Sequence, residues 1–213
     1  MIILPASLRR QLARRVYGWD IDATAHIGRS LILVRHVSMG PESSIGSLNV
    51  IRDLEELRLG TGANIATRNW ISAHPLSAVV FTGSPDRRSV LILGEYAKIT
   101  NGHIIDCSDR VEFGDYAALA GFRSQILTHS ADLIRDTQVT KPVRLGERCA
   151  VMSGCMILSG TQVPARSIVS AGSVITTKLS KEQTFYRGNP AQAIRRLPDN
   201  LGYYHREGAQ VFG

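Results

Sequence analysis

The 213-residue chain has few aromatic side chains and lacks any long apolar run. Phe, Trp and Tyr make up 6% of the residues while 44% are hydrophobic, so an aliphatic core is expected. No stretch approaches the ~20 apolar residues that a membrane-spanning helix needs. The N-terminal segment is rich in arginine and lacks the apolar region of a signal peptide. These absences predict a cytoplasmic protein without a transmembrane segment.

Cysteine is scarce as well, and its spacing speaks against a disulfide framework. Cys107, Cys149 and Cys155 form an odd set, and none of them sits in a Cys-x-x-Cys pair. Unpaired thiols of this kind are typical of proteins in a reducing compartment. All three are interpreted as small core residues, since a nucleophilic role for Cys107 would need an activating base.

The formal charge is +7, yet the basic residues are scattered and form no patch interleaved with aromatic residues. This distribution is not typical of a nucleic-acid-binding surface, so no nucleic-acid partner is expected. A solvated basic surface would account for the charge. An anionic ligand that carries phosphates, such as coenzyme A, would account for it equally well.

What the sequence has in abundance is an aliphatic residue at every sixth position. Near the C-terminus the series is unbroken: Leu145, Val151, Ile157, Val163, Val169 and Ile175. Near the N-terminus it is Ile21, Ile27, Leu33, Met39, Ile45, Ile51 and Leu57. The register slips by two residues after Leu57 and again after Val111. A small residue follows four positions later at Ala25, Cys149, Cys155, Thr161, Ser167 and Ser173.

A six-residue period fits neither an α-helix nor a long alternating strand. It fits short straight segments that each turn one large and one small side chain inward and then bend. Glycines that follow the aliphatic residue, such as Gly28 and Gly146, are expected to permit that bend. Because one coil cannot bury its own apolar row, the coils must stack at strand spacing. The period therefore predicts a parallel β-helix.

This pattern resembles the hexapeptide-repeat acyltransferase superfamily. The resemblance implies an all-β fold, a single-stranded left-handed parallel β-helix with short terminal helices. Residues 1–20 are expected to form an N-terminal segment with a short helix, and residues 21–190 the acyltransferase domain with a protruding loop at 130–142. Residues 191–213 are expected to form a C-terminal cap and tail, with a short helix over 191–197. No register holds between Ile71 and Leu93, where a bulge or loop is expected.

The segments 101–115 and 121–130 resemble the active-site region of sugar acetyltransferases in that superfamily, including the maltose and galactoside acetyltransferase group. The resemblance implies that His129 is the general base and that Asp106 and Asn101 hold the acceptor sugar. His103 lies close to Asp106 in sequence and is a further candidate for the acceptor cleft. A sugar hydroxyl needs such a base because it is a poor nucleophile at neutral pH, where histidine is poised to take a proton.

The segments 170–174 (SAGSV) and 187–191 (RGNPA) resemble signature segments of the same superfamily. The resemblance implies acetyl-CoA as the co-substrate, bound along the late coils between the subunits of a homotrimer. Backbone groups of small residues and two basic side chains are the candidates for this site: Gly154, Gly160, Ala171, Gly172, Lys178 and Arg187.

Other functions fit the sequence less well. A zinc carbonic anhydrase of the same fold type would need three ligating histidines and an HxxxxH pair, which this chain lacks, so no metal is expected. A sugar nucleotidyltransferase would need a nucleotide-binding domain ahead of the repeats. The prediction is acetyl transfer to a sugar hydroxyl in polysaccharide or glycoconjugate biosynthesis. The alternatives are an N-acetyltransferase acting on an amino sugar and a non-catalytic β-helix scaffold.

Overall fold

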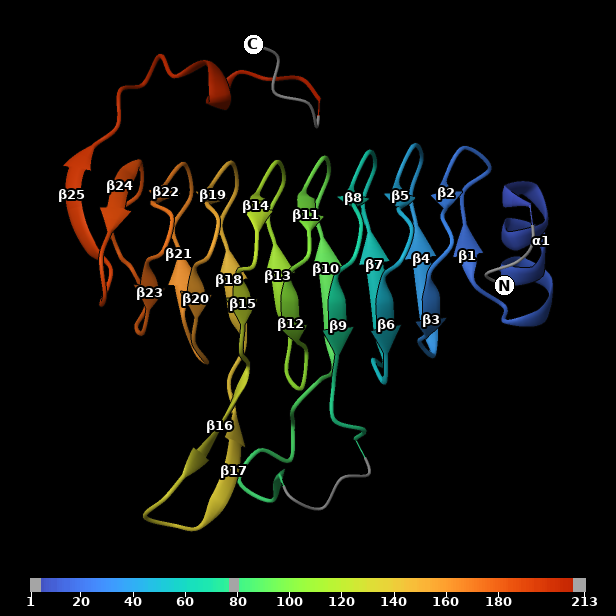
Figure 1. Cartoon of the computed structure of the whole chain (residues 1–213), viewed down its shortest axis with the longest axis horizontal. Helices are drawn as coiled ribbons and strands as arrows, with labels where there is room; N and C mark the ends of the chain where they lie inside the picture. The colour runs from blue at the N-terminus through green and yellow to red at the C-terminus, as the bar shows by residue number, and fades with distance from the viewer. Residues whose placement is uncertain (1–4, 77–80, 209–213) are drawn as a thin grey trace.

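The computed structural model describes residues 5–76 and 81–208, and these residues form a parallel β-helix. Each coil of the chain adds one strand to each of three sheets, which become the three faces of a prism (Figure 1). Sheet A consists of β1 (Asp20–Ile21), β4 (His36–Met39), β7 (Glu56–Leu59), β10 (Val90–Leu93), β13 (Val111–Phe113), β18 (Val143–Leu145) and β21 (Gln162–Val163).

The other two faces follow the same order along the axis. Sheet B consists of β2 (His26–Ile27), β5 (Ser44–Ile45), β8 (Asn64–Ile65), β11 (Lys98–Asn101), β14 (Ala118–Phe122), β19 (Ala150–Val151), β22 (Ile168–Val169), β24 (Thr184–Arg187) and β25 (Gln192–Arg196). Sheet C consists of β3 (Leu31–Leu33), β6 (Val50–Arg52), β9 (Trp70–Ser72), β12 (Ile104–Asp106), β15 (Gln125–Ile126), β20 (Met156–Ile157) and β23 (Val174–Ile175). We call the bend from sheet B to sheet C the BC corner, and the bend from sheet C to the next coil's sheet A the CA corner.

The predicted aliphatic series forms the core, with one correction. Its members are buried inside the prism and pair in register between coils, as Ile71 does with Ile105. Leu33 is the exception, since 58% of it is exposed while Ile32 fills the interior position. The left-handed winding implied by the resemblance stays a prediction.

The two slips in register have a common cause. Strands of sheet A turn two side chains inward instead of one, and both Leu57 and Leu59 of β7 are buried. The same holds for Val111 and Phe113 of β13. Alternate residues of a strand face the same side, so an extra inward residue appears as a shift of two.

The glycines after the aliphatic residues are needed for close approach rather than for an unusual backbone angle. A Cβ atom on Gly28 would lie 2.4 Å from the backbone of Gly46 in the next coil. Gly60, Gly94 and Gly114 meet the backbone of their neighbours in the same way. The predicted reason, backbone freedom at the bend, is therefore wrong for these positions. Stacked coils leave no room there for any side chain.

Two insertions leave the prism at the CA corner, below the coils in Figure 1. The first runs over 73–89 between β9 and β10, where a bulge or loop was expected, and its residues 77–80 lie outside the described part of the chain. The second is a hairpin of β16 (His129–Asp132) and β17 (Thr137–Thr140), which pair antiparallel. It occupies the position of the expected loop at 130–142.

The two ends of the prism are closed differently. Helix α1 (Ala6–Val16) packs on β1 and β2 at the N-terminal end, as the expectation of a short helix there requires. At the other end the expected helix over 191–197 is wrong, because β25 runs back antiparallel on β24. A short 3-10 helix, η2 (Gly202–Tyr204), follows. Among the described residues, no helix combines the length and apolar character needed to cross a bilayer.

Candidate functional site

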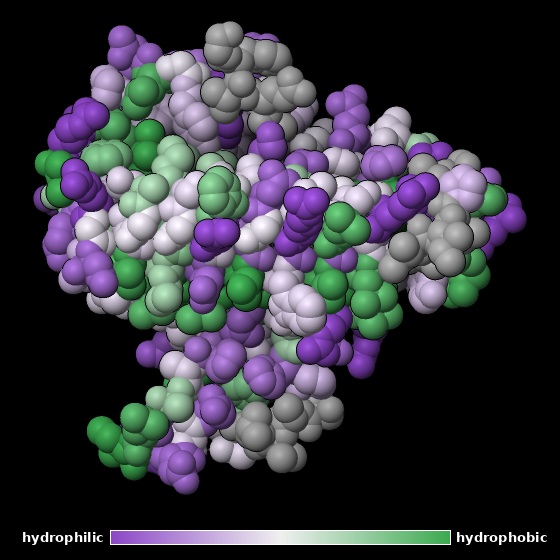
Figure 2. All heavy atoms as spheres, viewed as in Figure 1, coloured by the Kyte–Doolittle hydropathy of each residue, from purple (hydrophilic) through white to green (hydrophobic). Residues whose placement is uncertain are grey.

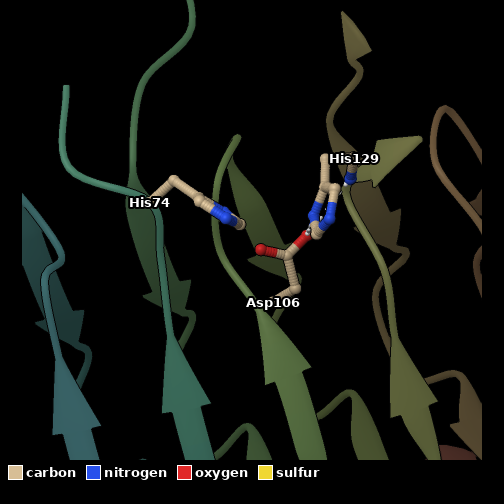
Figure 3. Close-up of side chains that lie close together, drawn as sticks. All are labelled: His74, Asp106 and His129. Atoms are coloured by element: carbon tan, nitrogen blue, oxygen red, sulfur yellow. Dashed lines mark hydrogen bonds and ion pairs between the residues drawn. The ribbon is translucent and has the colours of Figure 1, made fainter. Parts of the chain in front are cut away.

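The candidate site lies at the CA corner of three consecutive coils. The strands β9, β12 and β15 lie side by side, with Ile71 paired with Ile105 and Ile105 with Ile126. Three residues beyond these isoleucines the chain places His74, Ser108 and His129, so the repeat itself brings them together. Figure 3 shows His74 and His129 turned toward Asp106, which ends β12 between them.

Asp106 and His129 form a hydrogen-bonded pair. Nδ1 of His129 lies 2.8 Å from Oδ2 of Asp106, and the backbone N–H of His129 donates to the same oxygen. A carboxylate can only accept, so Nδ1 carries the proton and Nε2 keeps a free lone pair when the ring is neutral. The side chain of His129 is 32% exposed and that of Asp106 is 12% exposed. The imidazole therefore combines a buried partner with access to solvent.

The carboxylate of Asp106 is fully occupied by groups of the protein. Oδ1 accepts hydrogen bonds from the backbone N–H and the hydroxyl of Ser108. Oδ2 accepts from the backbone N–H and the hydroxyl of Thr128, besides the two bonds from His129. No oxygen is left to hold sugar hydroxyls, contrary to the expectation for Asp106. Its contacts are those of a group that orients His129.

The hydrogen bond between Asp106 and His129 shifts the pKa values of both groups in the directions that favour the charged forms. Burial opposes ionisation of Asp106, but the hydrogen bonds from His129, Ser108 and Thr128 outweigh it and hold the pKa of the carboxyl well below its usual range. The hydrogen bond to Asp106 raises the pKa of His129 above its ordinary value, while burial works against that rise. A base with a raised pKa is a stronger proton acceptor, provided that the pH keeps it neutral.

His74 is not among the residues predicted from the sequence, and the structure places it beside this pair. Its ring centroid lies 5.0 Å from that of His129, with the rings edge to face. Its Nδ1 lies 2.9 Å from the hydroxyl of Ser108, which in turn donates to Asp106. His74 lies in the stretch where no register could be held. The signal that could have found it is its spacing, three residues beyond a buried isoleucine, which His129 shares.

His103 lies inside the prism and not at the cleft. It is fully buried, its Nε2 lies 3.0 Å from the hydroxyl of Thr100, and its Nδ1 accepts from the backbone N–H of Ser124. Burial lowers the pKa of His103 to about 4. The expectation that it contacts the acceptor is corrected, since no face of its ring reaches solvent.

Asn101 lies at a different corner from the histidine pair. It ends β11, before the BC corner, and its Oδ1 accepts from the backbone and hydroxyl of Thr67. Asp106 lies at the far end of the following strand, β12. The expected grouping of Asn101 with His129 in one chain is therefore not present.

The residues expected to bind acetyl-CoA divide between the two corners. Gly160 lies between β20 and β21, at the CA corner one coil beyond His129, and Lys178 follows β23 at that corner on the next coil. The remaining candidates lie at or next to the BC corner: Gly154, Ala171, Gly172 and Arg187. A single ligand that reaches His129 within this chain can follow only the first group.

The cysteines are confirmed as buried side chains. Cys107, Cys149 and Cys155 are almost wholly inaccessible, and burial raises the pKa of each thiol. The pKa of Cys149 reaches about 12. A thiol in such an environment stays protonated, which makes it a poor nucleophile.

His74, Asp106 and His129 also lie close enough together to be considered as metal ligands, with one ligand atom from each within 4.8 Å of the others. The occupied oxygens of Asp106 speak against a metal, because only two nitrogens remain to coordinate it. A stable zinc site uses at least three protein ligands. We therefore derive no chemistry from a metal at this site.

No family model and no curated protein matches the sequence. Several solved structures match the fold. A hexapeptide transferase family protein from Anaplasma phagocytophilum is 18% identical, with 88% of this chain and 85% of that chain covered at a TM-score of 0.50. A maltose O-acetyltransferase from Clostridium difficile 630 is 20% identical, with 66% and 69% covered at 0.52.

A third solved structure has a higher TM-score. It is a variant of AntD, an N-acyltransferase from Bacillus cereus, in complex with dTDP and coenzyme A. It is 15% identical, with 79% of this chain and 86% of that chain covered at a TM-score of 0.60. At such low identity these similarities concern the fold. The similarity in fold to hexapeptide-repeat transferases, which the resemblance implied, is thereby confirmed.

Proposed function

We propose that this protein is an acyl-CoA-dependent acyltransferase that moves an acetyl group to a sugar hydroxyl, with His129 as the general base. The observation that carries the proposal is the hydrogen bond from Nδ1 of His129 to Asp106, which leaves Nε2 as a proton acceptor at an accessible corner. The maltose O-acetyltransferase and the N-acyltransferase that share the fold support the reaction class. Fold alone does not define a substrate, so the site has to carry the mechanism.

In the proposed reaction, Nε2 of His129 takes the proton of the acceptor hydroxyl as its oxygen attacks the thioester carbonyl carbon. The new C–O bond forms, the C–S bond breaks, and the imidazolium returns the proton to the departing thiolate. Asp106 acts on His129 and not on the substrate, because it fixes the tautomer and stabilises the imidazolium. General-base catalysis of this kind contributes about 10²–10⁴-fold.

Acetyl-CoA lies along the CA corner in this proposal. Gly160 and Lys178 follow His129 at the same corner on the next two coils, so a chain-like ligand that runs parallel to the axis would pass both. Lys178 is exposed and would offer a positive charge to a phosphate. AntD was solved with coenzyme A, which supports a CoA donor for this fold.

Transfer to an amine is the second candidate, since AntD is an N-acyltransferase. The same base would serve either acceptor. We place the hydroxyl first because a hydroxyl needs a general base to become a good nucleophile, whereas a free amine is already nucleophilic. A role in polysaccharide or glycoconjugate biosynthesis within the cytoplasm belongs to this proposal as well.

The protein assembles as a homotrimer in this proposal, and two apolar surfaces support it. Figure 2 shows hydrophobic surface at the tip of the hairpin, where Leu133 is 87% and Ile134 is 98% exposed. A second surface on sheet C includes the exposed Trp70, Ile104 and Met156. Exposed apolar patches of this kind mark contacts with a partner. Because the two surfaces differ, a contact between them is head-to-tail, and a rotation of one third of a turn between copies would close it into the ring of three that we propose.

Light scattering tests the assembly. The expected mass is three times the 23.3 kDa of one chain. The double variant Leu133→Ser/Ile134→Ser and the single variant Trp70→Glu should each release monomers, while Leu8→Ser, which changes an exposed leucine of α1, should not. A monomeric wild-type protein would contradict the proposal.

The activity is tested by following free thiol release from acetyl-CoA with a panel of sugars, nucleotide sugars and amino sugars. His129→Ala should lose about 10²–10⁴-fold in rate. His36→Ala changes an exposed histidine on sheet A and serves as the matched control. Near-full activity of His129→Ala would contradict the role of the base. If wild-type protein neither binds acetyl-CoA nor releases thiol, the non-catalytic scaffold becomes the better reading.

A further inference from the structure

His74 is attached to the same carboxylate as His129, but through an intermediate hydroxyl. The hydroxyl of Ser108 has one proton, which it donates to Oδ1 of Asp106 at 2.6 Å. That hydroxyl must therefore accept from Nδ1 of His74, 2.9 Å away, and it also accepts from the backbone N–H of His74 at 3.1 Å. Nδ1 of His74 thus carries its proton, and Nε2 of the neutral ring is a hydrogen-bond acceptor.

The two imidazoles consequently present the same kind of atom to the same space. The ring centroids lie 5.0 Å apart, and the ring planes are inclined at 77°. At that ring separation, Nε2 of each imidazole can accept a hydrogen bond of ~2.8 Å from one of two neighbouring hydroxyl groups. A vicinal diol offers two such hydroxyls about one hydrogen-bond length apart.

The position of His74 is held firmly although its ring is exposed. The guanidinium of Arg87 is buried, and its Nη1 donates to the backbone oxygens of His74 and Ser108 at 3.1 and 3.0 Å. Nη2 of Arg87 donates to the oxygen of Pro75, and the guanidinium lies over the ring of Phe81. Phe81 in turn meets the ring of His74 edge to face at 5.2 Å. A side chain this well supported is pre-organised to bind a ligand.

We propose that His74 is an acceptor-binding residue, whose Nε2 holds the hydroxyl adjacent to the one that His129 deprotonates. The acceptor of this enzyme is therefore a vicinal diol of a sugar ring, and one oxygen receives the acetyl group while its neighbour stays on His74. This inference rests on the proposed acyltransferase function and adds a substrate class to it. No protein group in the described residues donates to Nε2 of His74, so that acceptor is available to the substrate.

The test measures kcat and KM for the best substrate among a set of methyl hexopyranosides, and for its monodeoxy analogues that lack one hydroxyl beside the acetylated position. His74→Ala should lower kcat/KM for the complete diol by about 10-fold or more, mainly through KM, as loss of one such hydrogen bond implies. With the analogue that lacks the bound hydroxyl, His74→Ala should change nothing further, because the contact is already absent. The KM for acetyl-CoA should stay constant.

His74→Gln is the conservative variant. Its amide oxygen can reach the position of Nε2 and accept the same hydrogen bond, so it should recover part of the lost kcat/KM. A merely structural role for His74 would give equal losses with the diol and every monodeoxy analogue. Equal losses, or no loss in His74→Ala, would overturn the proposal while leaving the function of His129 intact.

A binding measurement separates this proposal from the proposed function. Nitrogen-15 spectra of the histidines are recorded with the methyl hexopyranosides in the absence of acetyl-CoA. A shift of Nε2 of His74 with the diol, absent with one monodeoxy analogue, supports the proposal even if no thiol is released in the activity assay. If His74 Nε2 does not respond to any sugar and no sugar is acetylated, the diol proposal falls together with the sugar acceptor.

Discussion

His103 and His129 lie on neighbouring coils and meet opposite surroundings. His103 points into the prism, where its partners are the neutral hydroxyl of Thr100 and a backbone N–H, and burial lowers its pKa to about 4. His129 lies at the CA corner, where the hydrogen bond to Asp106 raises its pKa. Burial lowers the pKa of an imidazole at both sites, and at His129 the hydrogen bond to the Asp106 carboxylate outweighs it.

The polar groups around the two histidines differ in charge. Inside the prism, the groups that contact His103 are uncharged, as the buried side chains of Asn69 and Ser124 illustrate. At the CA corner, Asp106 accepts hydrogen bonds from Ser108, Thr128 and His129, and its side chain remains 12% exposed. These donors stabilise the negative charge that in turn raises the pKa of His129.

Among the proposed changes, removal of the Asp106 carboxylate should have the largest effect on catalysis. Both oxygens of the Asp106 carboxylate accept hydrogen bonds, and Asp106→Asn replaces one of them with an NH₂ group. The resulting amide orients His129 poorly and carries no charge to stabilise the imidazolium. We expect kcat to fall by about 10²–10⁴-fold. Asp115→Asn, a carboxylate at a different corner, is the control. Steady-state kinetics with a check of the melting temperature measure the effect, and a kcat close to wild type would contradict it.

The pH profile should report the raised pKa of His129. Below that pKa the imidazole is protonated and cannot act as a base, so log kcat/KM should rise by one unit per pH unit and level off above pH ~6.5. In Asp106→Asn, any residual activity should level off at a lower pH, because the charge that raises the pKa is gone. A wild-type profile that is flat from pH 5 to 8 would speak against His129 as the base.

The stability contributions of the two histidines should depend on pH with opposite signs. The folded state lowers the pKa of His103, so its contribution is present above pH ~6.5 and is lost as the pH falls toward 4. The loss amounts to about 2 kcal/mol between pH 8 and 5. The raised pKa of His129 gives a contribution that is present below pH ~6.5 and lost as the pH rises through the folded value.

Urea denaturation of wild type, His103→Asn and His129→Gln at pH 5 and 8 tests these signs. The cost of His103→Asn in the free energy of unfolding should be larger at pH 8 than at pH 5. The cost of His129→Gln should be larger at pH 5, by ~0.5–1 kcal/mol for a partly exposed pair. If the cost in the free energy of unfolding changed with pH in the same direction for both variants, the opposite pKa shifts of His103 and His129 would be contradicted.

Loss of the Ser108 hydroxyl should have the smallest effect. Ser108→Ala removes one donor from Asp106 and the partner of His74 Nδ1, while the direct bond between Asp106 and His129 remains. A decrease in kcat/KM of about fivefold is expected, equivalent to ~1 kcal/mol. Ser44→Ala, on sheet B away from the CA corner, should retain wild-type kinetics. A loss as large as that of Asp106→Asn would mean that Ser108 is part of the base itself.

The core of the fold could be predicted from the sequence because each coil repeats the same local rule. Ile157 and Ile175 are buried for the reason that placed them in the six-residue series. The strand β25 could not be predicted in this way. Its residues favour a helix, but the open edge of β24 offers unpaired backbone groups, and pairing with them outweighs local propensity.

The candidate site was only partly predictable for a similar reason. His129 could be selected because it stands between a repeat segment and an insertion. The role of Asp106 could not, since it depends on Thr128 and Ser108, which donate to its two oxygens only after the coils have stacked. His74 lies three residues beyond Ile71 of β9. The six-residue pattern is interrupted in the insertion that follows, so this spacing could not be recognised in the sequence.

The reversed strand β25 has a consequence for solubility. A prism of parallel coils ends in exposed strand edges, and an identical prism could add to them end on end, which is the geometry of a growing fibre. β25 turns against β24 in the direction opposite to every coil strand, so the terminal edge of sheet B no longer matches the first coil of another copy. With α1 seated on β1 and β2 at the opposite end, the stack has a defined length.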